Sequence, residues 1–342
     1  MRAFITGVSG TALTEDERAF CREAEPWGLI VFDRNIATPD ALRGLIAEFR
    51  ATLGRNAPVL VDQEGGRVQR LRPPHWPLYP PGAAYGALYD RDRDSSLDAA
   101  RLGARLIAAD LAEVGIDVDC LPLADVPVAR ADPIIGDRAY GREPGKVAAI
   151  AAAVAKGLAG GGVLPVLKHI PGHGRASADS HNSLPVVDAD RATLEATDFA
   201  AFRPLAGLPL AMTAHVLFTA IDPAAPATLS PTIVTEVIRG WIGFRGVLMS
   251  DDISMGALAG SVGERSSAAI AAGCDVVLHC NGKLSEMREV AVAVPVLAGE
   301  AARRAAVALA QRKAPAPLDV AASRRAFSAL MAPVWPPAQG TA

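Results

Sequence analysis

The chain has 342 residues, of which 50% are hydrophobic and 21% charged, a composition typical of a globular protein with a sizeable core. Its formal net charge of −3 argues against the basic surface that most nucleic-acid-binding proteins carry. We therefore expect no nucleic-acid partner and no binding to an anionic membrane surface. The expected ligand is a small molecule.

The cysteines and the N-terminus predict where the protein resides. The four cysteines form no CxxC pair, which predicts free, buried thiols in a reducing compartment. Residues 1–17 turn polar by Thr14 without a convincing cleavage site, so we expect a first strand and no export signal. The alanine-rich stretch 147–167 is interrupted by Lys156 and a run of glycines, so no membrane span is expected. These features predict a soluble, cytoplasmic protein.

Short apolar runs alternate with helix-like segments along the chain. Helix starts are marked by a capping box at Thr14 and Glu17, by Thr38 before a proline, and by Ser230 before a proline. Apolar strands followed by crossover helices predict an α/β fold, namely a TIM (β/α)8 barrel, with a doubly wound sheet as the alternative. The eight predicted strands are residues 3–8, 28–32, 58–62, 116–120, 163–168, 209–213, 246–250 and 274–280.

The chain continues beyond the eighth strand. Residues 283–294 predict the last barrel helix, and residues 299–312 and 319–331 predict two more helices. We expect a TIM-barrel catalytic domain over residues 1–298 and a helical C-terminal extension over residues 299–342. The proline-rich tail of that extension, WPPAQGTA, is expected to be frayed.

Several predicted strands end in polar residues. The third runs into VDQEGGRVQR, the fifth into KHIPGHG, the sixth into THV and the seventh into SDDISMG, while the fourth leads through Asp119 and Asp125 toward DPIIGDRAYGRE. A lone aspartate such as Asp62 is equally well explained as a turn residue or a helix cap. Since active sites of TIM barrels lie at the C-terminal ends of the strands, five polar ends on one rim predict a site there.

The segment KHIPGHGRASADSH, residues 168–181, holds three of the six histidines. An aspartate two positions before a histidine can orient and polarise the ring, which suits proton transfer near neutral pH. We therefore expect catalysis here. The structural alternatives are a surface-directed Lys168, a core His169, and an Asx turn at Asp179 with an exposed His181.

Asp251 and Asp252 follow the seventh strand directly. Adjacent residues of an extended strand point in opposite directions, so one carboxylate should face the site and the other should cap the following helix. Periodicity alone leaves both assignments open.

Four linked motifs, VDQEGGRVQR, DPIIGDRAYG, KHIPGHG followed by ADSH, and SDDISMG, occur in an order and spacing that resembles the β-N-acetylhexosaminidases of glycoside hydrolase family 3. The resemblance is to the single-domain cytoplasmic type of Gram-negative peptidoglycan recycling, and it spans nearly all of the predicted barrel. Two positions depart from the pattern: Ile170 stands where an aromatic residue is common, and Ile253 where leucine is common. Neither position supplies chemistry.

The resemblance implies a retaining enzyme that removes non-reducing terminal N-acetylglucosamine from 1,6-anhydro-N-acetylmuramic acid, with or without its stem peptide. It implies that no metal or organic cofactor is needed, and we expect a monomer. In this chain it implies that Asp251 is the nucleophile and that His181, paired with Asp179, is the acid/base. The residues implied in sugar binding are Asp62, Arg70, Arg138, Lys168 and His169.

Three other functions stay open at this point. The cluster of His169, His173, Asp179, His181 and Asp251 could ligate zinc in a metal-dependent hydrolase, although no HxH or HExxH spacing occurs. The same pocket could bind muropeptide fragments without turnover, as a sensor. A histidine acid/base lacks the negative charge that repels phosphate, so a phosphorylase is the third alternative.

Overall fold

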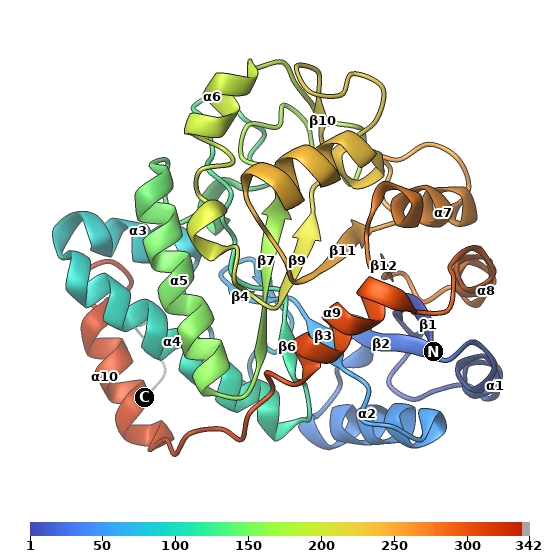
Figure 1. The fold of residues 1–342 in the computed structure, drawn as a ribbon. Helices are drawn as coiled ribbons and strands as arrows, with labels where there is room; N and C mark the ends of the chain where they lie inside the picture. The colour runs from blue at the N-terminus through green and yellow to red at the C-terminus, as the bar shows by residue number, and fades with distance from the viewer. Residues whose placement is uncertain (337–342) are drawn as a thin grey trace.

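The computed structural model describes residues 1–336. Eight parallel strands close into a barrel in the order β1-β12-β11-β9-β7-β6-β3-β2 (Figure 1). The predicted TIM barrel is confirmed, and every predicted strand overlaps one of these. Their bounds are β1 (Arg2–Thr6), β2 (Pro26–Val31), β3 (Val59–Val61), β6 (Val118–Asp119), β7 (Leu164–Ile170), β9 (Leu210–Thr213), β11 (Val247–Asp252) and β12 (Val276–His279).

Helices surround the barrel, and the predicted caps are present at their starts. Thr14 Oγ1 accepts a hydrogen bond from the Glu17 amide at 3.1 Å, and Ser230 Oγ accepts one from the Ile233 amide at 3.1 Å. The helices are α1 (Glu15–Ala24), α2 (Pro39–Leu53), α3 (Gly82–Arg91), α4 (Arg93–Glu113), α5 (Pro144–Gly160), α6 (Arg191–Ala196), the π-helix η5 (Ile233–Trp241), α7 (Val262–Ala272) and α8 (Leu284–Ala293). Short 3-10 turns are η1 (Asp33–Asn35), η2 (Gly136–Arg138), η3 (Arg203–Leu205) and η4 (Ala227–Leu229).

Two small strand pairs lie outside the barrel and were not predicted. Strand β4 (Gln63–Gly65) forms an antiparallel hairpin with β5 (Val68–Gln69), and β8 (Val186–Val187) pairs in parallel with β10 (Leu217–Phe218). Strands this short show no periodicity that a sequence pattern could reveal. The β4–β5 hairpin follows β3 directly and therefore presents its side chains at the C-terminal end of the barrel.

Alternation along the strands decides which residues face the barrel interior. In β11, Met249 packs inside the barrel whereas Leu248 packs against the helices; Leu60 of β3 and Val166 of β7 also point inward. Two positions further along lie Asp62, Lys168 and Asp251. Alternation does not carry the inward face as far as Asp251, because the register of β11 with β12 shifts between Met249 and Asp252.

The opposite end of the barrel is covered by α9 (Gly299–Leu309). Ala305 and Ala308 of this helix pack against the residues that fill the barrel interior. Arg304 Nη1 lies 2.8 Å from Asp275 Oδ1, and Asp275 directly precedes β12. The last helix, α10 (Val320–Met331), packs against α4. Both predicted C-terminal helices are confirmed, whereas the domain boundary at residue 298 stays a prediction.

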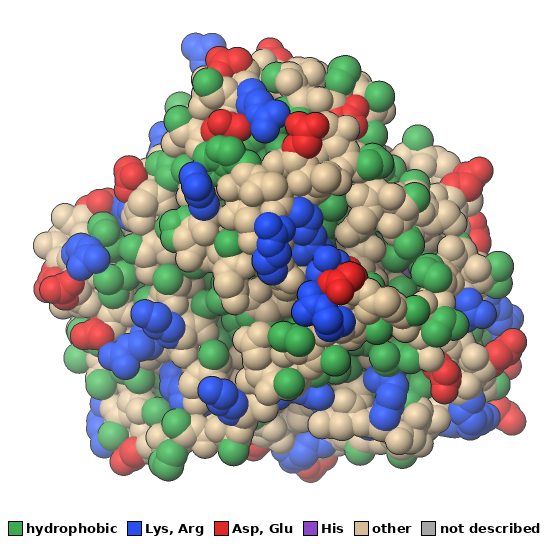
Figure 2. All heavy atoms as spheres, in the orientation of Figure 1, with side chains coloured by type: hydrophobic (Ala, Val, Ile, Leu, Met, Phe, Trp, Pro, Cys, Tyr) green, Lys and Arg blue, Asp and Glu red, His purple; other side chains and the backbone are tan. Residues whose placement is uncertain are grey.

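The surface carries charges of both signs. Figure 2 shows basic side chains gathered near the middle of the face that α9 crosses. On α9 itself, Arg303 is paired with Glu300 and Arg304 with Asp275. No helix within residues 1–336 has the length and apolar character needed to cross a bilayer. The four cysteines are free and buried, as predicted. Most of the tail predicted to fray, residues 337–342, lies outside the described residues.

Candidate active site

A cavity of about 440 Å³ opens at the C-terminal ends of the strands. The structure brings nearly all of the predicted site residues together on its wall, and Asp179 contacts it indirectly, through a hydrogen bond to His181. The predicted convergence of polar strand ends on one rim is therefore present, while the role of each side chain stays a prediction. The predicted residues that line the cavity are Asp62, Arg70, Arg138, Lys168, His169, His181 and Asp251.

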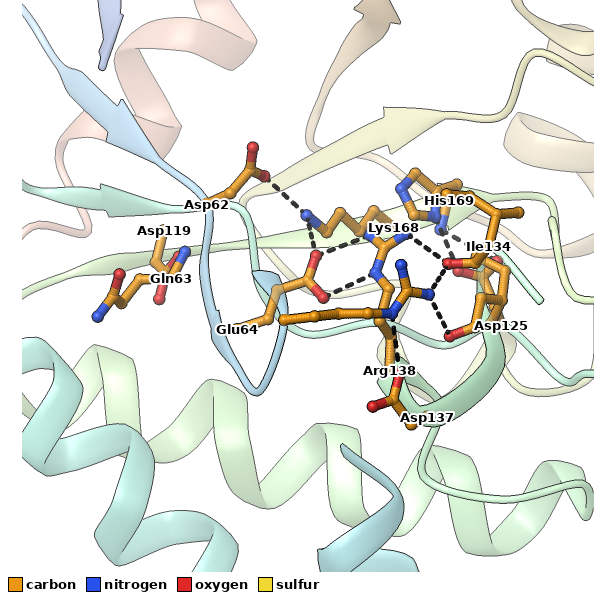
Figure 3. A network of polar contacts seen from close by, with 12 residues as sticks. Asp62, Gln63, Glu64, Asp119, Asp125, Ile134, Asp137, Arg138, Lys168 and His169 are labelled. Atoms are coloured by element: carbon orange, nitrogen blue, oxygen red, sulfur yellow. Dashed lines mark hydrogen bonds and ion pairs between the residues drawn. The ribbon is translucent and has the colours of Figure 1, made fainter. Parts of the chain in front are cut away.

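Lys168 lies between two carboxylates on the cavity wall (Figure 3). Its Nζ is 2.9 Å from Asp62 Oδ1 and 2.7 Å from Glu64 Oε1. Arg138 contacts Glu64 through two parallel hydrogen bonds, from Nε to Oε2 at 2.9 Å and from Nη2 to Oε1 at 2.8 Å. Arg70 completes the network with a contact of 3.3 Å to Asp62. Only 2% of the Lys168 side chain is exposed, so its orientation is held by these pairs.

The charges of this network reinforce one another. Burial by itself would raise the pKa of Asp62, but Lys168 and Arg70 outweigh burial and hold this pKa well below its ordinary value. Burial by itself would lower the pKa of Lys168, and Asp62 with Glu64 reverses the effect and raises it. All of these groups therefore stay charged at neutral pH. Fixed charged donors and acceptors of this kind suit the recognition of sugar hydroxyls.

Asp251 and Asp252 both reach the cavity wall, but their carboxylates have different surroundings. Asp252 Oδ1 accepts hydrogen bonds from the amides of Ser254 and Cys280 at 3.1 Å each, and its Oδ2 accepts one from Ser254 Oγ at 2.7 Å. Asp252 thus holds the loop after β11 in place. The expectation that one carboxylate faces the site while the other caps the following helix is wrong, because both line the cavity and the N-cap of α7 is Ser261. Asp251 lines the cavity where β11 shifts its register with β12, and the hydrogen bond to its Oδ1 comes from the adjacent Asp252 amide at 2.8 Å.

The electrostatic environment of Asp251 favours its ionised form. Burial by itself would raise its pKa, but the nearby imidazoles of His169 and His215 outweigh burial and lower it. An ionised carboxylate at a strand end on the cavity wall can attack an electrophilic carbon held in the cavity.

His169 is oriented by a buried carboxylate. Its Nδ1 lies 2.7 Å from Asp125 Oδ2, and Asp125 Oδ1 accepts a hydrogen bond from the His173 amide at 2.7 Å. Because Asp125 accepts the proton on Nδ1, the Nε2 atom of His169 is left to face a ligand. His173 in turn contacts Ser180 Oγ through Nε2 at 3.1 Å, and burial lowers the pKa of His173 to about 4. A neutral His173 thus ties the loop that follows β7 to the barrel.

Asp179 and His181 form a hydrogen-bonded pair on that loop. His181 Nδ1 lies 2.7 Å from Asp179 Oδ1, and the same oxygen accepts the His181 amide at 2.9 Å. The predicted Asx turn and the predicted hydrogen bond between the two side chains are thus both present, while the acid/base role of the pair stays a prediction. The His181 side chain is 62% exposed at the mouth of the cavity, where it can exchange protons with solvent.

The loop carrying this pair docks on the segment after β11. The amide of Gly256 donates to the His181 carbonyl at 3.1 Å, and the amide of Ala257 donates to the Ser180 carbonyl at 3.0 Å. A methyl group at Gly256 would lie 2.7 Å from the His181 carbonyl oxygen, so this close approach requires glycine. Asp251 and His181 are therefore presented by two segments that contact each other directly.

Sequence reasoning missed two residues of the site. Glu64 links Arg138 to Lys168, and it stands inside the VDQEGGRVQR motif, where only Asp62 and Arg70 were singled out. Asp125 was noted as a polar residue after the fourth strand but received no role, and it orients His169. Their positions in the polar strand-end segments were the available signal.

Comparison with known proteins agrees with this geometry. Residues 8–312 match the model of the glycosyl hydrolase family 3 N-terminal domain. The chain belongs to glycosyl hydrolase family 3. As a member of this family, it is a glycoside hydrolase, and the reading as a non-catalytic sensor is set aside.

The similar proteins of the family carry consistent names. The β-hexosaminidase of Chromobacterium violaceum is 42% identical over 278 residues, covering 80% of this chain and 77% of that protein. That of Aromatoleum aromaticum is 39% identical over 278 residues, covering 80% and 78%. NagZ from Neisseria gonorrhoeae, solved in complex with N-trifluoroacetyl-D-glucosamine, superposes with a TM-score of 0.83 at 31% identity over 97% of both chains. The same protein has also been solved in complex with a zinc ion.

Proposed function

We propose that this family 3 glycoside hydrolase is a retaining exo-β-N-acetylglucosaminidase. The proposal rests on one observation above all: the ionised Asp251 and the hydrogen-bonded Asp179–His181 pair border the same cavity, on two segments that contact each other. The β-hexosaminidase names of the related proteins and the glucosamine derivative bound by NagZ support N-acetylglucosamine as the sugar.

The proposed reaction has two steps. In the first, a carboxylate oxygen of Asp251 bonds to the anomeric carbon while the glycosidic bond breaks, and His181 gives its proton to the departing oxygen. In the second, His181 removes a proton from water, and the water oxygen attacks the anomeric carbon on the face that the aglycone left, opposite Asp251, while the bond between Asp251 and the sugar breaks. Two displacements return the original configuration. Asp179 stabilises the imidazolium form of His181 in each cycle.

The remaining predicted residues are proposed to hold the sugar. Lys168 and Arg138 offer cationic donors, Asp62 offers an acceptor, and His169 offers Nε2. Because each of these side chains is fixed by a partner inside the protein, little conformational entropy is lost when the sugar binds. Arg70, which holds Asp62, lies at the wall of the same cavity.

We further propose that the substrate is N-acetylglucosaminyl-1,6-anhydro-N-acetylmuramic acid, with or without its stem peptide, in cell-wall recycling. The support is the motif resemblance to that branch of the family and the likeness to NagZ over the whole chain. Release of N-acetylglucosamine from the anhydro-disaccharide, followed by chromatography, tests the substrate. A cytoplasmic location and a monomeric state remain predictions.

Covalent trapping tests the mechanism. Incubation with a fluorinated N-acetylglucosaminyl inactivator should leave the sugar attached to the enzyme, and peptide mass mapping should locate it on Asp251. A label on Asp252, or complete inactivation without any covalent adduct, would overturn the assignment.

A metal-dependent hydrolase is the first alternative. Within residues 1–336 no group of three or more His, Cys, Asp or Glu side chains is arranged to hold a metal ion. Asp125 occupies Nδ1 of His169, and Asp179 occupies Nδ1 of His181. We expect full activity after dialysis against EDTA, whereas loss of activity that zinc restores would favour this alternative.

A phosphorylase is the second alternative. It is favoured by the cationic side chains on the cavity wall and by a histidine acid/base, which is never negatively charged and so does not repel phosphate. Rates measured with and without inorganic phosphate distinguish hydrolysis from phosphorolysis. Hydrolysis predicts free N-acetylglucosamine at an unchanged rate, and phosphorolysis predicts the sugar 1-phosphate.

A further inference from the structure

Helix α10 belongs to the C-terminal extension, for which the sequence indicates no role. In Figure 1 it lies beside α4 and α3, on the flank of the barrel, and none of its residues lines the cavity. Its residues nonetheless contact two tyrosines, Tyr79 and Tyr85, that support the cavity wall. Arg324 and Phe327 make these contacts.

Arg324 takes part in a three-residue polar cluster. Its Nη2 donates to Asp110 Oδ1 of α4 at 2.6 Å, and the hydroxyl of Tyr79 donates to Asp110 Oδ2 at 2.6 Å. The Nη1 atom of Arg324 lies 3.4 Å from the Tyr79 hydroxyl. Tyr79 is 3% exposed, so this cluster fixes the position of a buried ring.

Phe327 packs against the rings of both tyrosines. The ring centroids are 6.3 Å from Tyr79 and 6.4 Å from Tyr85. Gly103 of α4 makes room for this packing, because a Cβ there would lie 2.7 Å from the Phe327 ring. Phe327 therefore holds the two tyrosines together from one side.

Tyr79 is attached to the β4–β5 hairpin through its backbone. Its carbonyl accepts a hydrogen bond from the Gly66 amide at 2.8 Å, and its amide donates to Gln69 Oε1 at 3.0 Å. A Cβ at Gly65 would lie 2.4 Å from the carbonyl oxygen of Pro80, so the two segments are in direct contact. This hairpin presents Glu64 to the cavity network.

Tyr85 lies on α3, which supports the other half of the same ion pair. A Cβ at Gly82 of this helix would lie 2.0 Å from the Arg138 carbonyl oxygen, and Tyr85 stacks edge-on against Tyr140 at 6.5 Å. The backbone on either side of Arg138 thus rests on α3. Both partners of the Glu64–Arg138 pair are supported by residues that α10 covers.

We propose that α10 sets the position of the Glu64–Arg138 pair at the sugar subsite, with Arg324 and Phe327 as positioning residues. The inference rests on the proposed sugar-binding role of Arg138. A displacement of the hairpin relative to η2 would separate the two parallel hydrogen bonds of this pair, and misplacement of a binding group by about 1 Å is enough to cost up to about 100-fold in catalysis. Loss of the Arg324 contacts should therefore weaken sugar binding.

The test uses Arg324→Ala in the full-length chain, measured well below its melting temperature. We expect a rise of about 5- to 20-fold in KM for an aryl N-acetyl-β-glucosaminide and in the inhibition constant of free N-acetylglucosamine, with a smaller change in kcat. Arg324→Lys should restore part of the binding, because it keeps a cation beside Asp110. Arg325→Ala is the matched control, since Arg325 is the neighbouring residue of the same helix and is exposed.

If Arg324 contributes only to stability, Arg324→Ala will lower the melting temperature and leave the KM and the inhibition constant unchanged. This result overturns the proposal. In an Arg138→Ala background, Arg324→Ala should add less than about twofold to the inhibition constant, and a full additional effect also overturns it. If Arg138→Ala itself leaves N-acetylglucosamine binding unchanged, the sugar-binding role of Arg138 fails together with this inference. A normal Arg138 effect with no Arg324 effect contradicts the α10 inference alone.

Discussion

At the scale of single residues, the neighbouring carboxylates Asp251 and Asp252 differ in what they hold. Asp252 accepts three hydrogen bonds from the loops that follow β11 and β12, whereas Asp251 accepts one, from the next amide. Removal of these two side chains should therefore affect different properties of the protein.

We expect Asp251→Ala to retain its fold and to lose nearly all turnover, because the covalent step disappears. Asp252→Ala should lower the free energy of unfolding by about 1 to 3 kcal/mol, because the amides of Ser254 and Cys280 lose their acceptor. Urea denaturation and kcat/KM of both variants check this. Near wild-type turnover of Asp251→Ala would contradict the nucleophile assignment.

His181 allows a prediction that depends on the leaving group. The proton from an acid is needed most when the departing oxygen is basic, so His181→Ala should be severely impaired on a natural disaccharide. On an activated aryl glycoside the covalent intermediate should still form, deglycosylation should become limiting, and azide should restore turnover with retained configuration. Equal losses on both substrates, without a burst and without rescue by azide, would remove the acid/base role of the Asp179–His181 pair.

His173 links stability to pH. Burial lowers its pKa from 6.5 to about 4 in the folded protein, so below pH 6.5 the unfolded chain binds more protons than the folded one. The stabilisation from neutral His173 is complete above pH 6.5 and is lost as the pH falls toward 4. As the pH falls from 6.5 toward 4, the unfolding free energy of the wild-type protein should decrease by about 1 kcal/mol per pH unit more than that of His173→Gln. Parallel pH profiles of the two proteins in urea would contradict the assignment.

At the scale of elements, the cavity network joins strands that are distant in sequence. Lys168 at the end of β7 connects to Asp62 after β3 and to Glu64 of the β4–β5 hairpin, and Arg138 joins the hairpin to η2. The family resemblance implies sugar contacts for Asp62, Arg138 and Lys168. The structure adds a structural duty, because each charge is buried against a partner.

Lys168→Met should therefore lower both activity and stability. The substitution keeps much of the side-chain volume but leaves Asp62 and Glu64 as neighbouring buried carboxylates without their shared cation, at a cost of about 3 to 5 kcal/mol in unfolding free energy. Thermal and urea denaturation measure this cost. Lys283→Met is the control, because 67% of that side chain is exposed. A Lys168 variant as stable as the control would show that the network is not structural.

At the scale of the whole molecule, α9 closes the end of the barrel opposite the cavity. Ala305 and Ala308 complete the interior cluster, and Arg304 and Arg312 pair with Asp275 and Asp117 at the starts of β12 and β6. The predicted boundary at residue 298 would thus separate the barrel from side chains that cover its interior.

A chain ending at residue 298 should consequently fail to fold cooperatively, because the lower ends of the barrel strands would lose their apolar cover and Asp275 would lose one of its two arginine partners. Circular dichroism and thermal melting check this. A chain ending at residue 313, which keeps α9 and lacks α10, is the control and should retain a barrel. A cooperative melt of the shorter chain would support 1–298 as an independent domain.

The sequence by itself determined the barrel and most members of the site. Eight apolar runs separated by capped helices are local patterns, and the polar residues after them follow directly in the chain, so strand ends such as Asp62, Lys168 and Asp251 were found without coordinates. Family resemblance then supplied their expected roles, which no spacing could provide.

Only the tertiary structure decided how two neighbouring residues meet the cavity and which partners hold each of them. Period-two alternation alone would put Asp251 on the face of Met249 and Asp252 on the other, but β11 shifts register between Met249 and Asp252, and both carboxylates line the cavity. The pairing of Glu64 with Arg138 and the contact of Phe327 with Tyr79 join segments far apart in the chain. Such contacts depend on packing in three dimensions, and no local pattern of residues encodes them.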